Sequence, residues 1–267
     1  MVKENLQNRT LSIRLSTNGF CFCSYIPSRP DSLQYSFHPA DDTTSLAVNL
    51  GNAIDECKFI KRGENYTVKA IIETAGYTLV PAEHDCKQDY KLFYRYCFPK
   101  CDSNFEIAAN RLAAQGLTIL FGIDKEVYSI LQSLGEVTYY CPASILMGYM
   151  TRKHSGEEQY MLAYIQQESI TVLSAKEGRI EVANTFSTAD SNDKLFYILS
   201  IWKEQGFSQT EDTLFLCGGK SVEEMQPALS RFIKNRKRIN PNEEFPSTLL
   251  NKTEGIPFDL QALILCE

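Results

Sequence analysis

Glycine and histidine are both scarce in this chain, with 14 and three residues among 267. So few glycines count against a protein built around several glycine-rich phosphate loops. Three histidines leave few general bases or metal ligands. The chain also lacks a run of about 20 apolar residues, which is the length that a membrane-spanning helix needs.

The N-terminal residues, the net charge and the cysteines of the chain exclude further classes of protein. Residues 1–10 are polar and contain no apolar stretch of the kind a signal peptide needs. The formal net charge of −6 argues against nucleic acid as the main partner. The nine cysteines are odd in number and scattered, so we expect reduced, buried thiols in a cytoplasmic protein. We expect no nucleic-acid partner and no direct membrane insertion.

The predicted secondary structure repeats itself about 150 residues apart along the chain. The apolar fraction of 43% is enough to build a buried core. The first set consists of strands at 11–16, 20–26 and 33–37, a helix at 43–59 and a strand at 66–72, with the hairpin signal Asn18-Gly19 after the first strand. The second set consists of strands at 160–165, 169–175 and 179–186, a helix at 193–205 and a strand at 213–217. The shared strand-strand-strand-helix-strand order predicts an α/β protein with a duplicated unit.

Further elements are predicted between and after the two sets. Between them we expect a strand at 77–81, an irregular aromatic stretch at 89–98, a helix at 105–115, a strand at 117–123, a helix at 125–132, a strand at 137–140 and a helix at 142–150. After them we expect a helix at 222–234 and an apolar helix at 258–266. The basic residues 234–238 are interpreted as the solvated end of the former helix.

Three segments resemble the actin-like ATPase superfamily, which includes sugar kinases, DnaK-type chaperones, actin, FtsA and PilM. Residues 11–20 and 162–170 stand where that superfamily has its two phosphate hairpins. Residues 214–219, an apolar strand ending in Gly218-Gly219, resemble its adenosine motif. The chain is most similar to the PilM/FtsA branch, and it resembles a small, uncharacterised bacterial family of PilM-like proteins. The resemblance implies two RNase H-like subdomains of β-β-β-α-β order in an actin-like ATPase fold.

The resemblance also implies where the domains begin and end. The first subdomain is expected at 1–151, with inserted α/β elements at about 78–141. The second is expected at 158–267, after a polar linker. The apolar helix at 258–266 is expected to pack back on the first subdomain.

Both phosphate hairpins lack the residues that active members of the superfamily use. Those members carry an aspartate for Mg²⁺ and a glycine that lets the backbone approach phosphate. Arg14 and Ser16 occupy these two positions in the first hairpin, and Tyr164 and Gln166 occupy them in the second. The predicted helix at 143–150 also lacks the carboxylate that some members place there. Magnesium-dependent phosphoryl transfer is therefore not expected.

The resemblance implies a degenerate nucleotide cleft, and two of its features have alternative interpretations. Its residues would be Arg14, Ser16, Thr17, Asn18, Tyr164, Gln166, Gly218 and Gly219. Arg14 either binds anions without a metal or, as we favour, is a solvated strand residue or salt-bridge partner. Gly218-Gly219 either contact adenosine or, as we favour, form a sharp strand-to-helix turn. No catalytic residue or metal ligand is assigned, and ATP with Mg²⁺ is a disfavoured cofactor.

Three hypotheses about function remain open at this point. The leading one is a non-catalytic scaffold or protein-binding module, with a protein partner or a second copy of the chain. The alternative is a divergent ATPase or kinase that binds nucleotide through other residues. A third is a metal or thiol site formed by His84, Cys86, Cys97 and Cys101, whose types suit zinc.

Overall fold

A computed structural model of the chain describes residues 9–27, 29–100, 104–153, 159–244, 253 and 255–265. Two compact units divide the chain: residues 1–144 with 248–256, and residues 145–247 with 257–267. The predicted subdomain boundaries and the predicted packing of the terminal helix stay predictions. None of the helices in the described ranges is long and apolar enough to cross a membrane.

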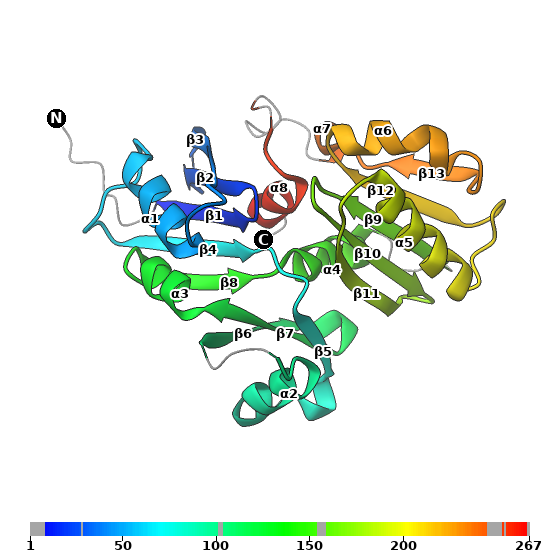
Figure 1. The fold of residues 1–267 in the computed structure, drawn as a ribbon, viewed down its shortest axis with the longest axis horizontal. Coiled ribbons are helices and arrows are strands. Elements are labelled where there is room, and N and C mark those ends of the chain that lie inside the picture. The colour runs from blue at the N-terminus through cyan, green and yellow to red at the C-terminus, as the bar shows by residue number, and fades with distance from the viewer. Residues whose placement is uncertain are drawn as a thin grey trace. The chain divides into compact units, whose positions relative to one another are not determined.

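The first unit is built on a five-stranded mixed sheet with the order β3-β2-β1-β4-β8. Its strands are β1 (Thr10–Ser16), β2 (Gly19–Ile26), β3 (Arg29–Pro39), β4 (Tyr66–Ile72) and β8 (Gly135–Tyr140). β1 runs antiparallel to β2 and parallel to β4, and β8 continues the parallel side. Two helices, α1 (Leu46–Glu56) and α3 (Lys125–Gln132), contact one another beside this sheet (Figure 1).

The second unit repeats this plan with a five-stranded sheet of the order β11-β10-β9-β12-β13. Its strands are β9 (Gln159–Ile165), β10 (Ser169–Lys176), β11 (Arg179–Ser187), β12 (Thr213–Gly218) and β13 (Asn235–Arg238), with helices α5 (Ser191–Glu204) and α6 (Lys220–Leu229). β9 runs antiparallel to β10 and parallel to β12. The α/β class and the repeated strand-strand-strand-helix-strand order are therefore confirmed.

The buried residues follow from the sequence periodicity. In β1, Leu11, Ile13 and Leu15 share one face of the strand because side chains alternate between faces. α1 begins at Leu46 because the side chain of Ser45 accepts a hydrogen bond from the Val48 backbone N–H. In the second unit, one apolar cluster joins strands to α5 and α6, and its members include Met161, Val172, Ile198, Trp202, Leu216 and Met225.

A smaller sheet lies between β4 and α3 in the chain, with the order β5-β7-β6. Its strands are β5 (Tyr77–Pro81), β6 (Phe105–Leu112) and β7 (Leu117–Asp124), and α2 (Tyr90–Cys97) packs on it (Figure 1). Short 3₁₀ turns occupy Ala82–His84, Lys87–Asp89 and Ala113–Gln115. Tyr90 and Tyr94 of α2 join Val80 and Leu120 in a separate small core. The remaining helices are α4 (Pro142–Lys153), α7 (Pro241–Glu244) and α8 (Phe258–Leu265).

Two predictions for this region were wrong. The alanine-rich segment 105–115 was expected to be a helix, but residues 105–112 form β6, paired with β7 from Phe105 opposite Asp124 onwards. Tertiary pairing overrides helix propensity here, and Gly116, with φ +64°, ends the 3₁₀ turn that joins the two strands. The stretch 89–98 was expected to be irregular, but it contains α2, whose inward-facing tyrosines are four residues apart.

The basic segment at the end of the second unit was also misassigned. α6 ends at Leu229, and residues 235–238 form the edge strand β13 instead of the end of a helix. β13 pairs in parallel with β12, from Thr213 opposite Asn235 to Leu216 opposite Arg238. Charged side chains suit an edge strand because they discourage pairing with further chains.

A buried asparagine connects the small sheet to the start of α4. The Asn110 Nδ2 donates to the Tyr139 carbonyl at 2.7 Å, while its Oδ1 accepts from the Cys141 amide at 3.2 Å and the Ser144 hydroxyl at 2.7 Å. Asn110 is 9% exposed. The side chain therefore satisfies backbone groups at the end of β8 and at the N-terminus of α4.

Replacement of Asn110 should destabilise the first unit. Asn110→Ala leaves the buried Tyr139 carbonyl and Cys141 amide without this partner, so we expect the free energy of unfolding to fall by about 2–4 kcal/mol. Urea denaturation followed by circular dichroism measures this change. Asn52→Ala, at an exposed position of α1, is the control and should change stability by less than about 0.5 kcal/mol. Equal effects of the two variants would contradict the role assigned to Asn110.

Candidate functional site

The first hairpin places a buried arginine where the superfamily would have a metal-binding aspartate. The Arg14 side chain is 4% exposed, and its Nη2 lies 3.0 Å from Oε2 of Glu73, which is 11% exposed. Glu73 directly follows β4, and its amide donates to the Leu15 carbonyl at 3.0 Å. Because a buried cation is costly without a partner, this ion pair is a structural requirement of the strand. Of the two interpretations of Arg14, the salt-bridge partner is the one that the geometry supports, although the side chain is not solvated.

The turn of this hairpin is closed by its own side chains. The Ser16 hydroxyl lies 2.6 Å from Asn18 Oδ1 and 2.7 Å from the Gly19 carbonyl oxygen, two acceptors for its proton. Thr17 and Asn18 are the two turn residues. Gly19, with φ +147°, begins β2, where a Cβ atom would lie 2.3 Å from the His38 carbonyl oxygen. The hairpin predicted from Asn18-Gly19 is therefore present, but the glycine avoids a clash with β3 and is not a turn residue.

A pocket of about 350 Å³ opens beside the hairpin in the first unit. Ser16, Thr17 and the three carboxylates of Asp41, Asp42 and Glu73 contribute to its wall, and none of its described lining residues is basic. Hydrogen bonds from the Thr43 hydroxyl and amide hold the pKa of Asp41 below its ordinary value, so this carboxylate stays ionised. An anionic wall disfavours phosphate groups.

The second hairpin is likewise filled by groups of the chain itself. Tyr164 is 3% exposed, and the Gln166 amide donates to the Ser169 carbonyl at 3.0 Å. Lys194 reaches the turn from α5 and donates to the Gln167 carbonyl at 2.7 Å. Lys194 is 5% exposed, and burial lowers its pKa. Sequence reasoning missed this lysine, because it lies 27 residues away from the turn.

The two glycines at the end of β12 differ in how much space surrounds them. Gly218 has φ +134°, and a Cβ atom there would lie 2.2 Å from the Ile165 carbonyl oxygen on β9. Gly219 is the N-cap of α6, and a Cβ atom there would meet nothing within 4 Å. The favoured interpretation was a strand-to-helix turn. At this turn β9 lies so close to position 218 that only a glycine fits there. Nothing in the packing requires a glycine at position 219.

Matched serine substitutions should separate the two positions. Gly218→Ser forces an L residue into a strained conformation against β9, so we expect a loss of about 2 kcal/mol or more in unfolding free energy. Gly219→Ser adds a side chain that meets no atom within 4 Å of its Cβ, so it should cost clearly less stability than Gly218→Ser. Thermal or urea unfolding of both variants provides the comparison. A Gly219→Ser protein as unstable as Gly218→Ser would show that the packing argument is wrong.

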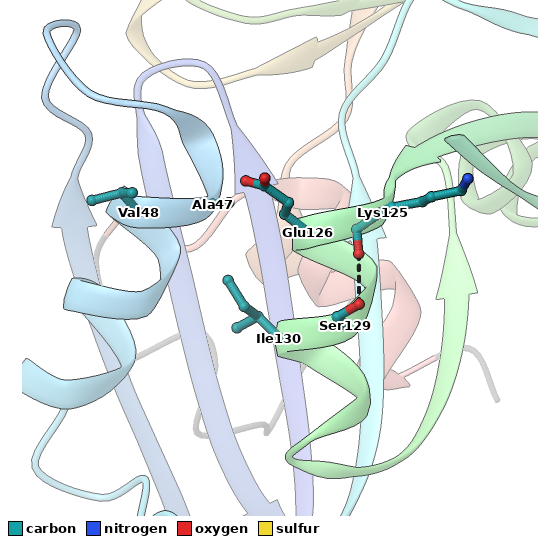
Figure 2. Close-up of a pocket in the computed structure, with 6 residues that line it drawn as sticks. All are labelled: Ala47, Val48, Lys125, Glu126, Ser129 and Ile130. Carbon is teal, nitrogen blue, oxygen red and sulfur yellow. Dashed lines mark hydrogen bonds between the residues drawn. The ribbon is translucent and has the colours of Figure 1, made fainter. Parts of the chain in front are cut away.

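A second hollow of about 530 Å³ lies between α1 and α3 (Figure 2), and sequence reasoning missed it. Ala47, Val48 and Ile130 give it apolar walls, with Lys125, Glu126 and Ser129 completing the lining. Figure 2 shows Glu126 and Ile130 directed toward α1, and Lys125 directed away from it. No single segment of the sequence signals this hollow, because its walls come from two helices that are about 80 residues apart in the chain.

Comparison with known proteins identifies the family. The model of the family described as "Protein of unknown function (DUF3822)" matches residues 2–235. The chain belongs to this family. No curated protein sequence matches it significantly.

Solved structures show the fold of this DUF3822 protein. A Bacteroides thetaiotaomicron protein, described as having an actin-like ATPase fold and unknown function, is 28% identical with a TM-score of 0.84, over 100% of this chain and 99% of that one. The predicted actin-like ATPase fold is therefore confirmed. A chain of the PilM–PilN type IV pilus biogenesis complex is 13% identical with a TM-score of 0.58, over 96% of this chain and 97% of that one. At this identity the second likeness concerns the fold alone.

The cysteines of this DUF3822 protein are not all buried, contrary to expectation. Cys86 and Cys97 are exposed, whereas Cys21, Cys23, Cys57, Cys141 and Cys217 are buried. Cys97 Sγ lies 3.3 Å from Thr78 Oγ1, and His84 lies beside Glu83. Within the described ranges, no group of three or more His, Cys, Asp or Glu side chains is arranged to hold a metal ion. Cys101, the fourth residue of the zinc hypothesis, lies outside the described residues.

Thiol reactivity should follow this division. Burial raises the pKa of Cys23 to about 12 and that of Cys141 to about 11. A raised pKa keeps a thiol protonated until the pH approaches it, so at pH 8 only about one Cys23 in ten thousand is a thiolate. Iodoacetamide should therefore label Cys86 and Cys97 first in the native protein, as read by peptide mass spectrometry. In denaturant the five buried cysteines should become equally reactive, and native labelling of Cys23 as fast as Cys86 would contradict the structure.

Proposed function

We propose that this DUF3822 protein is a non-catalytic, PilM-like member of the actin-like ATPase fold that acts by binding a protein partner. The observation that carries the proposal is the buried ion pair of Arg14 and Glu73 in the first hairpin. Active members are expected to bring a metal ion to this position. Here the positive charge belongs to the Arg14 side chain instead of a bound ion, and it is already paired with the Glu73 carboxylate.

The second hairpin supports the same proposal independently. The buried ammonium of Lys194 donates to the Gln167 carbonyl, so a fixed cation also occupies the turn of this hairpin. Both aspartates and both glycines of the active pattern are absent from the sequence. Losing one metal ligand can be compensated by another residue, but here every Mg²⁺ ligand that the resemblance implies is missing from both hairpins.

The pocket beside the first hairpin argues in the same direction. Its wall carries the carboxylates of Asp41 and Asp42, which repel the phosphate groups of a nucleotide unless a metal ion or a basic residue intervenes, and that of Glu73, whose charge Arg14 balances. The hydrogen bonds that Thr43 donates keep Asp41 charged. The pocket beside the first hairpin therefore offers unfavourable electrostatics for a nucleotide.

We propose a protein partner as the ligand in place of a nucleotide. The distant structural neighbour named above is a PilM–PilN complex, so one protein with a related fold binds another protein. We propose the same use of the fold here, with the partner left to experiment. The alternative, a divergent ATPase or kinase, requires nucleotide contacts from residues other than the hairpin pairs.

Titration calorimetry with Mg-ATP separates the proposal from this alternative. We expect no heat of binding at millimolar nucleotide, because the Arg14 guanidinium is already paired with Glu73 and the pocket wall carries the ionised Asp41. The matched variant combines Arg14→Met with Glu73→Gln, which removes both charges of the ion pair together and keeps the side chains near their original size. Micromolar binding by the wild type, or ATP hydrolysis that this double variant abolishes, would overturn the proposal.

A further inference from the structure

The outward face of α2 exposes more apolar surface than the rest of the fold leads one to expect. Tyr96 is 88% exposed and Leu92 is 67% exposed, the two largest values among the exposed large apolar side chains of the described residues. They are four residues apart and so lie on one face of the helix, one above the other. Isolated exposed apolar residues are common in proteins, but a stacked pair of this exposure is less so.

A row of cations runs beside this apolar pair. Lys91 and Arg95 each precede one of the apolar residues, so they form a parallel row about 100° around the helix. Both are exposed, and α2 contains no acidic residue. Lys91 has one acidic neighbour, Glu106, at 4.0 Å. The outward face of α2, defined by these two rows, is therefore apolar along one side and basic along the other.

The inward face of α2 is fixed at two points, which makes the outward face rigid. The Tyr90 hydroxyl donates to Asp85, whose other carboxylate oxygen lies 2.7 Å from Arg111 Nε. The Tyr94 hydroxyl donates to the Gly76 carbonyl at 3.0 Å. The ring of Tyr94 lies against Gly122, where a Cβ atom would be 2.8 Å from its hydroxyl oxygen. A surface held in place before binding loses little conformational entropy when a partner arrives.

We propose that the outward face of α2 binds an acidic protein segment that carries an apolar side chain. Acidic residues of the partner would face Lys91 and Arg95, and its apolar side chain would cover Leu92 and Tyr96. Tyrosine and arginine are among the residues that dominate binding energy at protein interfaces. An anionic membrane is the less suitable occupant, because an eight-residue helix with two exposed apolar residues buries little surface in lipid. The inference rests on the proposed function, since it names a surface and a chemistry for the protein partner.

Fluorescence anisotropy with labelled synthetic peptides tests this surface. The probe is a peptide of Glu-Glu-Leu repeats, compared with peptides of Ser-Ser-Leu and Lys-Lys-Leu repeats. The wild type should bind the acidic peptide, and added salt should weaken the binding because exposed charges are screened. Leu92→Ser with Tyr96→Ser should weaken it by about tenfold or more. Lys91→Glu with Arg95→Glu should abolish it and shift the preference to the basic peptide.

A matched control comes from another exposed aromatic residue with a nearby cation. Phe196→Ser with Lys203→Glu on α5 changes an apolar side chain that is 64% exposed and an exposed lysine, and it should leave peptide binding unchanged. The proposal is wrong if this control loses as much affinity as the α2 variants. It is also wrong if the wild type binds no acidic peptide, or binds the serine peptide equally well.

Two further measurements separate the explanations. Vesicles of phosphatidylcholine with phosphatidylglycerol test whether α2 binds an anionic membrane. The protein-partner proposal is overturned if the protein binds these vesicles through Leu92 and Tyr96 but does not bind the acidic peptide. Failure at α2 is distinguishable from failure of the proposed function. The Mg-ATP titration does not involve α2, so a protein that binds neither nucleotide nor any peptide would refute the α2 surface and leave the argument against a nucleotide standing.

Discussion

A charge that is buried must be paired, and this constraint shapes both hairpins of the molecule. In the first unit, the parallel register of β1 and β4 pairs Arg14 with Ile71, and Glu73, two residues further along the chain, reaches the Arg14 guanidinium with its side chain. Removing a charged group from water costs several kcal/mol, so the pair holds the end of β4 against the hairpin. In the second unit, Lys194 of α5 plays a comparable part at the turn by binding a backbone carbonyl. Two units with the same topology have thus arrived at fixed cations by different residues from different elements.

The repeated architecture could be predicted from the sequence because its signals are local. Alternating apolar residues indicated the hairpins, and apolar residues three and four apart indicated α1 and α5. The apolar strand ending in Gly218-Gly219 pointed to a sharp turn, and the carbonyl of Ile165 supplies the physical reason for the first glycine. The absence of the hairpin aspartates could likewise be predicted, since it depends only on which residues occupy the ends of β1 and β9.

The features that could not be predicted from the sequence depend on contacts between residues far apart in the chain. β6 reads as a helix because alanine favours helices, and only its pairing with β7 makes it a strand. β13 consists of polar and charged residues, so no apolar pattern marks it, and its pairing with β12 is what defines it. The ion pair of Arg14 spans 59 residues of sequence, from position 14 to position 73, and Lys194 lies 27 residues away from Gln167. The hollow between α1 and α3 is a property of two packed helices, which no single segment reveals.

The position of the small sheet in the chain has a consequence for how the two units fold. β8 must pair with β4 across the intervening residues 73–134, whereas β13 pairs with β12 across residues 219–234 only. The first loop is about four times as long as the second, that is, two doublings of length. If both loops are flexible, the entropic cost of closing the first is higher by about 1.2 kcal/mol. A small sheet that is already folded shortens the effective loop. In the second unit β13 can therefore pair with β12 through a short loop. In the first unit β8 pairs fastest with β4 after the β5-β7-β6 sheet has formed.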